Sequence, residues 1–435
     1  MEVKKMSDYY LRGCLIWPES PEKIRICEGG VLEIRDGKIA RVHESFSPAD
    51  ADGNKPELPL RDMGEALVVP PFADIHLHAV QYVNRGLGLD RELLEWLSTY
   101  TYPEERRFED LAYADKVFHA LARDLKANGS LYSVIFSSLH RPATLRLMEI
   151  LEEAGLEAYV GKVNMDQNGG PGLQETAEGS LRETEDWLEE RLTQHPESRV
   201  RPIITPRFIP SCSEALLKGL GELVERYHLP VQSHLNENPA EVAWVQSLCP
   251  ERKNYLDAYD YYGLLPQDQT IMAHCIHNTP EEEQLLLDRG VRIAHCAASN
   301  GNLGSGILRC REYLRRGMKI GIGSDISGGD CLSMQDNLRN SLKASALLGR
   351  MTGEKVNPLS FKELFWLATR GGSEFFGTGK GRFEAGADAD YLVVDMPDEW
   401  SFRPLSPEEK LQKFLFLGKP SDLKARVLGG QELSV

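Results

Sequence analysis

Short apolar runs alternate with longer amphipathic segments through the middle of the chain, between about residues 70 and 372. The eight runs are residues 66–75, 131–136, 158–163, 200–205, 231–234, 270–274, 291–295 and 320–324. The segments between them, such as 142–154 and 213–227, carry apolar residues at helical spacing. Apolar strands that alternate with crossover helices form parallel sheets, so the pattern predicts an α/β fold with a (β/α)8 TIM-like barrel. A doubly wound open sheet is the alternative, but no Gly-x-Gly-x-x-Gly segment follows the first run.

The two ends of the chain have a different pattern. Residues 31–34 and 39–42 alternate apolar and polar positions around the turn signal Arg-Asp-Gly-Lys, which is typical of a β-hairpin. Residues 391–395 and 425–428 resemble them. Because chain termini often lie close together, we expect both ends to combine in one small β-sandwich domain. The predicted division is 1–69 and 373–435 for the small domain and 70–372 for the barrel.

Composition and charge narrow the classes of function. The chain has 435 residues, of which 41% are hydrophobic and 27% charged, as in ordinary globular proteins. Its net charge of −16 argues against binding to nucleic acid, which needs a basic face. No run approaches the roughly 18 apolar residues of a membrane span. Eight cysteines without a Cys-x-x-Cys pair indicate reduced thiols, so we expect a cytoplasmic protein.

Polar side chains cluster where the predicted strands end. Five of the eleven histidines fall at these positions: His76, His78, His234, His274 and His295. Arg207 and Phe208 follow the fourth run, and Asp325 follows the eighth. Residues i and i+2 of a strand point to the same side, so two histidines one residue apart can direct both imidazoles to one point. Barrel enzymes build their sites at these strand ends, so we expect one site there.

The residue types at these strand ends favour a divalent metal ion. The four predicted ligands are His76, His78, His234 and Asp325. Three neutral imidazoles and one carboxylate suit zinc or iron(II) and leave one position for water. A bound ion lowers the pKa of water from 15.7 to about 7, which makes hydroxide available at neutral pH.

Three residues are predicted to act on protons or on the developing charge. Glu237 lies three residues after His234 and is placed to take a proton from the metal-bound water. His274 can hydrogen-bond the attacking hydroxide, and Asp325 can serve as proton acceptor as well as ligand. The set predicts metal-assisted hydrolysis.

Other interpretations stay open for single residues. Asp325 could instead cap the helix that follows. His295 could belong to the site or only to strand packing. Lys162, at the end of the third run, raises the possibility of a carbamylated lysine that bridges a second metal.

The layout of these residues resembles the amidohydrolase superfamily, in its mononuclear metal-dependent deaminase branch. Further segments are similar to the guanine deaminases within it. They are residues 78–82 (His-Ala-Val-Gln-Tyr), 94–97 (Leu-Glu-Trp-Leu), 205–208 (Thr-Pro-Arg-Phe), 232–238 (Gln-Ser-His-Leu-Asn-Glu-Asn) and 325–329 (Asp-Ile-Ser-Gly-Gly). The likeness runs over nearly the whole chain, and the segments at 94–97 and 205–208 are more specific than the metal set.

The resemblance implies a hydrolase acting on C–N bonds of cyclic amidines, which converts guanine to xanthine and ammonia with one zinc ion, in a homodimer. Gln81 would then hydrogen-bond the purine edge, Arg207 its carbonyl oxygen, and Phe208 would contact the ring face. The purine would also border on His78, His234, Glu237 and Asp325. An Arg fork and an aromatic platform suit a planar heterocycle that carries a carbonyl.

Some segments depart from the family pattern. Residues 70–74 read Pro-Pro-Phe-Ala-Asp, residues 295–298 read His-Cys-Ala-Ala, and Asp330 is an extra acid after the eighth run. The last two lie in loops expected at the pocket mouth, so other substrates stay open. The alternatives are a deaminase or dechlorinase of another amino-substituted purine, pterin or triazine, and a non-catalytic barrel that acts as a scaffold.

Overall fold

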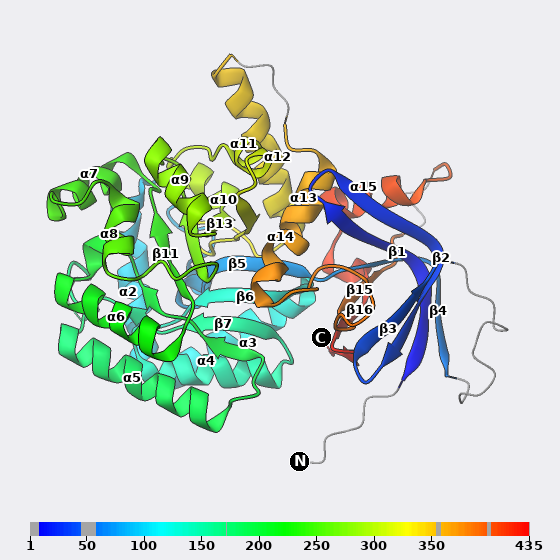
Figure 1. Ribbon diagram of the computed structural model, residues 1–435, viewed down its shortest axis with the longest axis horizontal. Coiled ribbons are helices and arrows are strands. Elements are labelled where there is room, and N and C mark those ends of the chain that lie inside the picture. The colour runs from blue at the N-terminus through cyan, green and yellow to red at the C-terminus, as the bar shows by residue number, and fades with distance from the viewer. Residues whose placement is uncertain (1–7, 45–57, 171, 354–357, 398–401, 435) are drawn as a thin grey trace.

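The computed structural model describes residues 8–44, 58–170, 172–353, 358–397 and 402–434. It contains a large α/β body and a smaller β body beside it (Figure 1). Both ends of the described chain lie in the smaller body, as the sequence pattern predicted.

The smaller body is built on one seven-stranded sheet with the order β17-β16-β15-β4-β1-β2-β3. The strands are β1 (Tyr9–Ser20), β2 (Lys23–Arg35), β3 (Lys38–His43), β4 (Leu60–Val69), β15 (Tyr391–Val394), β16 (Leu423–Leu428) and β17 (Gln431–Glu432). Among these seven strands of the described chain, only β1 and β4 pair in parallel. Asp36 and Gly37 have φ of 47° and 74° in the turn between β2 and β3, which confirms the predicted hairpin.

The outer strand β3 also meets the segment that precedes β15, because the amide of Ile39 donates to the carbonyl of Ala387 over 2.8 Å. The strands enclose an apolar core that includes Leu15, Trp17 and Tyr391. A small β domain from both termini is therefore confirmed. Its seven strands belong to one hydrogen-bonded sheet rather than to two separate ones.

The larger body contains two four-stranded parallel sheets, β5-β6-β7-β9 and β11-β12-β13-β14. The strands are β5 (Phe72–His78), β6 (Ser130–Phe136), β7 (Glu157–Gly161), β9 (Val200–Pro202), β11 (Val231–Leu235), β12 (Thr270–His274), β13 (Arg292–His295) and β14 (Lys319–Ile322). A parallel bridge between Ile204 and Val231 links the two sheets on one side. On the other side the amide of Asp325 donates to the carbonyl of His76 over 2.8 Å. The eight predicted parallel strands of a TIM-barrel-like fold are confirmed.

Some strand limits differ from the prediction. The first apolar run, 66–75, is split: its start belongs to β4 of the smaller sheet, and β5 begins at Phe72. Pro70 and Pro71 lie between the two strands and cannot donate hydrogen bonds to a ladder. The fourth run is likewise interrupted after Pro202, and a short pair, β8 (Val163–Asn164) with β10 (Thr205–Pro206), extends beyond the sheet.

Helices cover the parallel strands, and one further helix, α15 (Pro407–Leu417), packs against β2 and β4 of the smaller sheet. The longer ones over the parallel strands are α3 (Leu111–Ala127), α4 (Arg141–Glu153), α5 (Ala177–Gln194), α6 (Glu214–Tyr227), α7 (Pro239–Leu248), α9 (Pro280–Asp288), α12 (Met334–Met351) and α13 (Phe361–Ala368). Short ones are α8 (Tyr255–Tyr261), α10 (Ala297–Asn302), α11 (Cys310–Arg315) and α14 (Arg370–Ser373). Side-chain caps fix the starts of several of them: Ser213 caps α6, and Thr279 with Glu282 forms a capping box at α9. Within the described ranges, no helix is long and apolar enough to cross a membrane.

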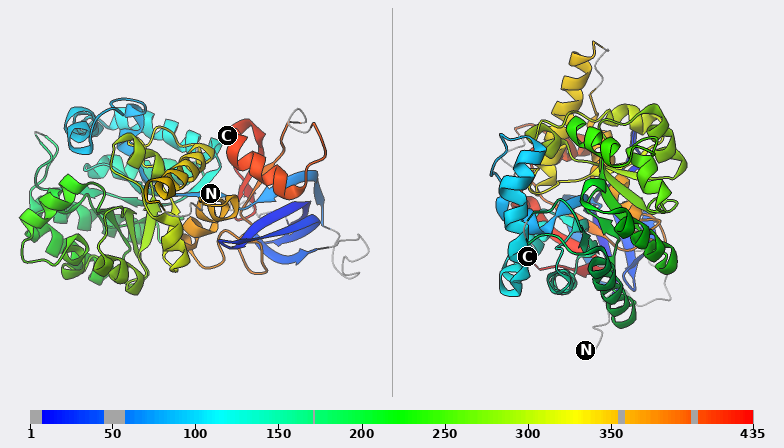
Figure 2. Two further views of the ribbon diagram at one scale, coloured as in Figure 1. Left: turned by 90° about the horizontal axis from the view of Figure 1, so that it is seen from above. Right: turned by 90° about the vertical axis from the view of Figure 1, so that its left-hand side faces the viewer.

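A winding segment of short helical turns separates β5 from α3. It consists of η2 (Ala79–Asn84), α1 (Leu93–Trp96), η3 (Leu97–Thr101), α2 (Tyr102–Glu105) and η4 (Arg106–Glu109). Figure 2 shows this segment, in light blue to cyan, on the outside of the larger body. Leu93, Trp96 and Leu97 pack there against Leu303, so the segment is anchored at the carboxyl ends of the strands.

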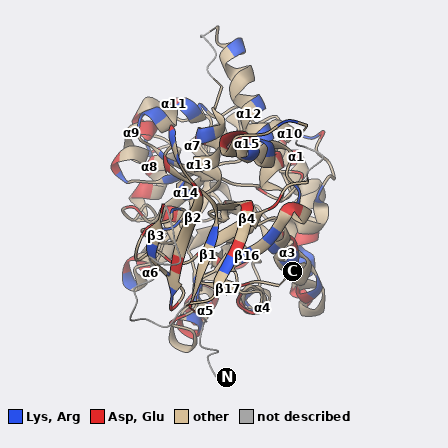
Figure 3. Ribbon diagram, turned by 90° about the vertical axis from the view of Figure 1, so that its right-hand side faces the viewer, with Lys and Arg blue, Asp and Glu red and all other residues tan. Residues whose placement is uncertain are grey.

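Basic and acidic residues are interspersed along the ribbon in Figure 3, which views the molecule from the side of the smaller body. The acidic groups that matter for chemistry are instead buried, among them Glu237 and Asp325.

Candidate active site

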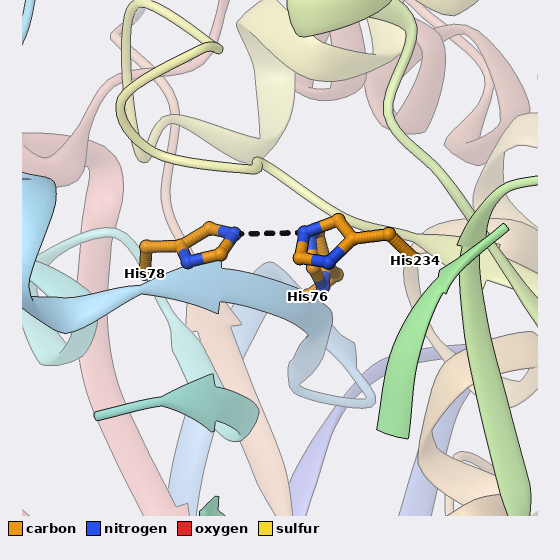
Figure 4. Close-up of side chains that lie close together, drawn as sticks. All are labelled: His76, His78 and His234. Atoms are coloured by element: carbon orange, nitrogen blue, oxygen red, sulfur yellow. Dashed lines mark hydrogen bonds between the residues drawn. The ribbon is translucent and has the colours of Figure 1, made fainter. Parts of the chain in front are cut away.

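The four predicted metal ligands converge at the carboxyl ends of the strands. Nε2 of His78 lies 3.1 Å from Nε2 of His234 (Figure 4). Oδ1 of Asp325 lies 3.2 Å from Nε2 of His76 and 3.4 Å from Nε2 of His78. His76, His78 and Asp325 are buried, and His234 is partly exposed. Their donor atoms belong to two groups that share His76: one with His78 and His234, and one with His274 and Asp325. Within each group the donor atoms lie within 4.8 Å of one another, close enough to share a bound ion.

Local backbone geometry brings these side chains together. His76 and His78 alternate with Leu77 along β5, so both point to the same side of the strand. Asp325 follows β14 with a left-handed φ of 48°, and its amide donates to the carbonyl of His76. This bond holds the carboxylate beside the first pair of imidazoles. Asp325 does not cap a helix: the next one, α12, begins with Ser333 as its cap.

The protonation of the histidines suits a metal. Nδ1 of His234 donates to the carbonyl of Arg207 over 2.6 Å, which leaves the lone pair of Nε2 facing the site. Burial lowers the pKa of His78 and of His234 well below the ordinary value, so both are neutral at pH 7. Burial also raises the pKa of Asp325, but the imidazole of His76 and its neighbours lower it more, so Asp325 is ionised. Neutral nitrogen donors and one carboxylate fit a divalent ion.

Glu237 and His274 lie next to this donor set. Oε2 of Glu237 is 3.4 Å from Nε2 of His274, and that nitrogen is 3.8 Å from Oδ2 of Asp325. Burial raises the pKa of Glu237 to about 7, although the charge of His274 opposes this shift. A carboxyl group with a pKa near neutrality can both accept and release a proton.

Neighbouring side chains fix the orientation of these two groups. Nδ1 of His274 donates to Oδ1 of Asn300 over 2.8 Å, which directs Nε2 into the site. Oγ of Ser305 donates to Oε1 of Glu237 over 3.1 Å. Glu241 accepts the backbone amide of Glu237 over 3.0 Å. Both proton-handling groups are thus held by hydrogen bonds outside the metal set.

A cavity lies over the donor atoms. All the predicted substrate-binding residues line it, namely His78, Gln81, Arg207, Phe208, His234, Glu237 and Asp325. Leu93, Trp96, Leu97 and Leu303 supply its apolar walls. An apolar enclosure with a few convergent polar groups is typical of a site for a small planar ligand.

Several residues at the site were not predicted from the sequence. Glu105 accepts hydrogen bonds from Gln81 and from Arg207. Asn300 and Glu241 orient His274 and Glu237. Glu105 adjoins Glu104 in a segment with no clear apolar period, so nothing in the sequence singled it out. Asn300 could have been inferred from the sequence, because its segment begins directly after the histidine at the end of the seventh strand.

Two residues that the sequence left open as members of the site, Lys162 and His295, lie outside the donor set. Nζ of Lys162 lies 2.8 Å from Oε1 of Glu175 and does not belong to the converging donor set. His295 is buried at the end of β13, and burial lowers its pKa to about 4. Neither residue lines the cavity over the donor atoms.

Comparison with known proteins agrees with this geometry. The model of the amidohydrolase family matches residues 67–433, and the chain belongs to this family. The guanine deaminase of Rattus norvegicus is 40% identical over 377 residues, which cover 84% of this chain and 82% of the rat protein. The guanine deaminase of Homo sapiens is 39% identical over 378 residues, with 84% and 82% covered.

A solved structure extends the comparison. The crystal structure of guanine deaminase from C. acetobutylicum with bound guanine in the active site has a TM-score of 0.92 and 38% sequence identity. The match covers 98% of this chain and 100% of that one. The resemblance indicated by the sequence motifs is therefore confirmed.

Proposed function

We propose that this protein is a guanine deaminase, which hydrolyses guanine to xanthine and ammonia. The observation that carries the proposal is the convergence, in one enclosed cavity, of a metal donor set, a proton-handling carboxyl group and the pair Gln81 and Arg207. The relatives named guanine deaminase, at 39 and 40% identity over most of the chain, support the same substrate.

His76, His78, His234 and Asp325 would hold the ion, which we propose to be zinc. When bound, a divalent ion supplies hydroxide at neutral pH by lowering the pKa of water to about 7. Iron(II) accepts the same ligands, so metal analysis of the purified protein decides between the two.

The protein's own groups manage the protons. Glu237 takes the proton released from water and delivers it to the ring nitrogen beside C2, as oxygen bonds to C2. His274, held by Asn300, donates a hydrogen bond to the incoming oxygen. Asp325 accepts the second proton of the water. Asp325 passes this proton to the exocyclic nitrogen, which leaves as ammonia while the remaining oxygen forms the C2 carbonyl of xanthine.

Three other residues that line the cavity are proposed to recognise the purine ring. Arg207 donates to the ring carbonyl, Gln81 hydrogen-bonds the adjoining edge, and Phe208 contacts the ring face. Phe208 is itself packed edge-on against Trp244, with ring centroids 6.1 Å apart. A planar purine with one carbonyl complements this arrangement.

The direct test is an assay of the metal-loaded protein with guanine. Xanthine and ammonia are expected in equal amounts. Adenine, 2-aminopurine, a pterin and an amino- or chlorotriazine are offered under the same conditions to test the alternative substrates. Absence of xanthine would refute the proposal, and turnover of any of these compounds would refute the non-catalytic scaffold.

Three broader properties belong to the same proposal. All eight cysteines lie within the described residues and carry free thiols, which supports a reducing, cytoplasmic setting. We also propose a homodimer, from the family likeness, and the division of the chain at residues 69 and 372. Light scattering should give a mass twice that of the 48.8 kDa chain if the dimer forms.

A further inference from the structure

Glu105 lies between the two residues proposed to recognise the purine. Its Oε1 accepts from Nε2 of Gln81 over 2.9 Å, and its Oε2 accepts from Nη1 of Arg207 over 2.5 Å. All three side chains are buried, with Glu105 only 5% exposed. Glu105 reaches them from α2, in the winding segment between β5 and α3.

We propose that Glu105 is a positioning residue that makes the cavity selective for purines with a ring carbonyl. It would act by fixing which hydrogen-bonding atoms Gln81 and Arg207 present to the ligand. The inference rests on the proposed function, because it takes these two residues as the purine contacts.

The orientation of Gln81 follows from its two partners. Its Nε2 donates to Glu105, and its Oε1 accepts the backbone amide of Ser327 over 3.3 Å. A reversed amide would face the carboxylate with its oxygen and the amide N–H with its nitrogen, so both contacts would become repulsive. Gln81 therefore has one N–H and one oxygen lone pair left for a ligand. A lactam edge, with one N–H and one carbonyl, complements that pair.

The orientation of Arg207 depends on the same carboxylate. Its guanidinium is buried over the ring of Tyr102, 5.1 Å from the centroid. Since a buried guanidinium needs a charge partner, Glu105 both compensates its charge and occupies Nη1. The N–H groups that Glu105 does not use stay available for a ligand oxygen. Without the carboxylate, Arg207 would have no buried acceptor of its charge among the contacts described for it.

A purely structural role is the competing explanation. Glu105 could serve only to tie α2 to the barrel, since both of its partners lie on other elements. In that case its substitution would weaken the binding of every ligand alike. If Glu105 positions the recognition pair, its loss should weaken only ligands that carry the carbonyl.

Two ligands that are not deaminated separate these explanations. Hypoxanthine carries the carbonyl and N1–H but no amino group at C2, and purine lacks all of these. We measure Kd of both by calorimetry on the metal-loaded wild type and on Glu105→Gln. The neutral amide can accept from only one of the two donors. The wild type should prefer hypoxanthine by about tenfold or more, the range of hydrogen bonds to charged groups, and Glu105→Gln should bring this preference close to unity.

A neighbouring carboxylate provides the matched control. Glu104 belongs to the same turn but binds Tyr113 and Arg107 instead. Glu104→Gln should keep the wild-type preference. Arg207→Lys should lose it, as Glu105→Gln does.

Each result decides the inference. An equal loss of affinity for hypoxanthine and purine in Glu105→Gln, or an unchanged preference, would overturn it. If Glu105→Gln fails to fold or to bind metal, Glu105→Asp replaces it. That variant keeps the charge but is one methylene too short to reach both partners, so a reduced preference is again expected. If the wild type leaves guanine unchanged, the proposed function is wrong. If the wild type deaminates guanine but Glu105→Gln still prefers hypoxanthine to purine, only this inference is wrong.

Discussion

Nε2 of His78 faces Nε2 of His234 at 3.1 Å, within a cluster of nitrogen and oxygen donors. The carbonyl of Arg207 holds the proton of His234 on Nδ1, so its Nε2 offers a lone pair to this space. Nε2 of His76 makes no well-aligned hydrogen bond with the described residues, although Oδ1 of Asp325 lies 3.2 Å away. Imidazole nitrogens whose lone pairs no protein group satisfies are typical ligands of a metal ion.

Removal of one of these nitrogens should remove the metal. We expect the wild type to bind one divalent ion per chain and His78→Ala to bind far less, with loss of deamination. Elemental analysis after dialysis measures the content. His295→Ala is the control, because this histidine is also buried at a strand end but lies outside the donor set. A full complement of metal in His78→Ala would contradict the assignment of the ligands.

The role of Glu237 can be separated from metal binding. Glu237→Gln keeps the size of the side chain and the hydrogen bond from Ser305 but cannot carry a proton. Turnover of guanine should fall by about two orders of magnitude or more, the value of general acid–base catalysis. Metal content and KM should change little. A rate near that of the wild type would refute the assigned role.

The hydrogen bond between His274 and Asn300 should matter for the rate as well. Asn300→Leu removes the acceptor of the Nδ1 proton, so the imidazole loses the orientation that directs Nε2 to Glu237 and Asp325. We expect kcat to fall by about tenfold or more, as for other groups that orient active-site histidines. Asn300→Asp keeps an acceptor oxygen at the same place and should retain more activity. Equal rates for the two variants would argue against this orienting role.

The sequence revealed most of the site because two regularities carry over into three dimensions. The alternation of side chains along a strand placed His76 and His78 on one side. The common direction of parallel strands brought His234, His274 and Asp325 to the same end of the body. Neither inference required knowledge of how the side chains pack.

The burial of Glu105 could not be predicted from the sequence, because it depends on tertiary packing and not on a periodic pattern of residues. Glu105 and Glu104 are adjacent and chemically identical, yet one is buried against Arg207 and the other pairs with Arg107 at the surface. Only the path of the winding segment between β5 and α3 decides between them. The split of the first apolar run was easier to foresee, because Pro70 and Pro71 mark the break.

A buried ionic cluster connects the two bodies and should govern stability. Nζ of Lys380 lies 3.0 Å from Oε2 of Glu157 on β7, and 2.9 Å from Oδ2 of both Asp388 and Asp390. Lys380→Met leaves these carboxylates without their shared cation. At pH 7 we expect destabilisation of about 3–5 kcal/mol, the range for breaking a buried ion pair. Urea unfolding followed by circular dichroism measures it.

The destabilisation caused by Lys380→Met should be smaller in acid, and the pKa of Asp388 sets the pH range of this change. Burial raises its pKa, but hydrogen bonds from Lys380 and Lys38 lower it to about 2, below the value of about 3.9 for an unfolded chain. The stability that Asp388 contributes is therefore complete above pH 4 and is lost as pH falls from about 4 to 2. Burial raises the pKa of Glu157, which thus takes up its proton before Asp388 does. The difference between wild type and Lys380→Met should accordingly decrease below pH 4.

A matched variant separates the buried cluster from surface charge. Lys38 also contacts Asp388 over 2.9 Å, but its side chain is 61% exposed. Exposed ion pairs contribute about 0–1 kcal/mol, so Lys38→Met should change the unfolding midpoint only slightly at any pH. The two lysines share one partner and differ in burial, so the contrast isolates the effect of the enclosed charge. If Lys380→Met and Lys38→Met destabilise equally, or if the effect of Lys380→Met grows in acid, the cluster does not hold the two bodies together by charge.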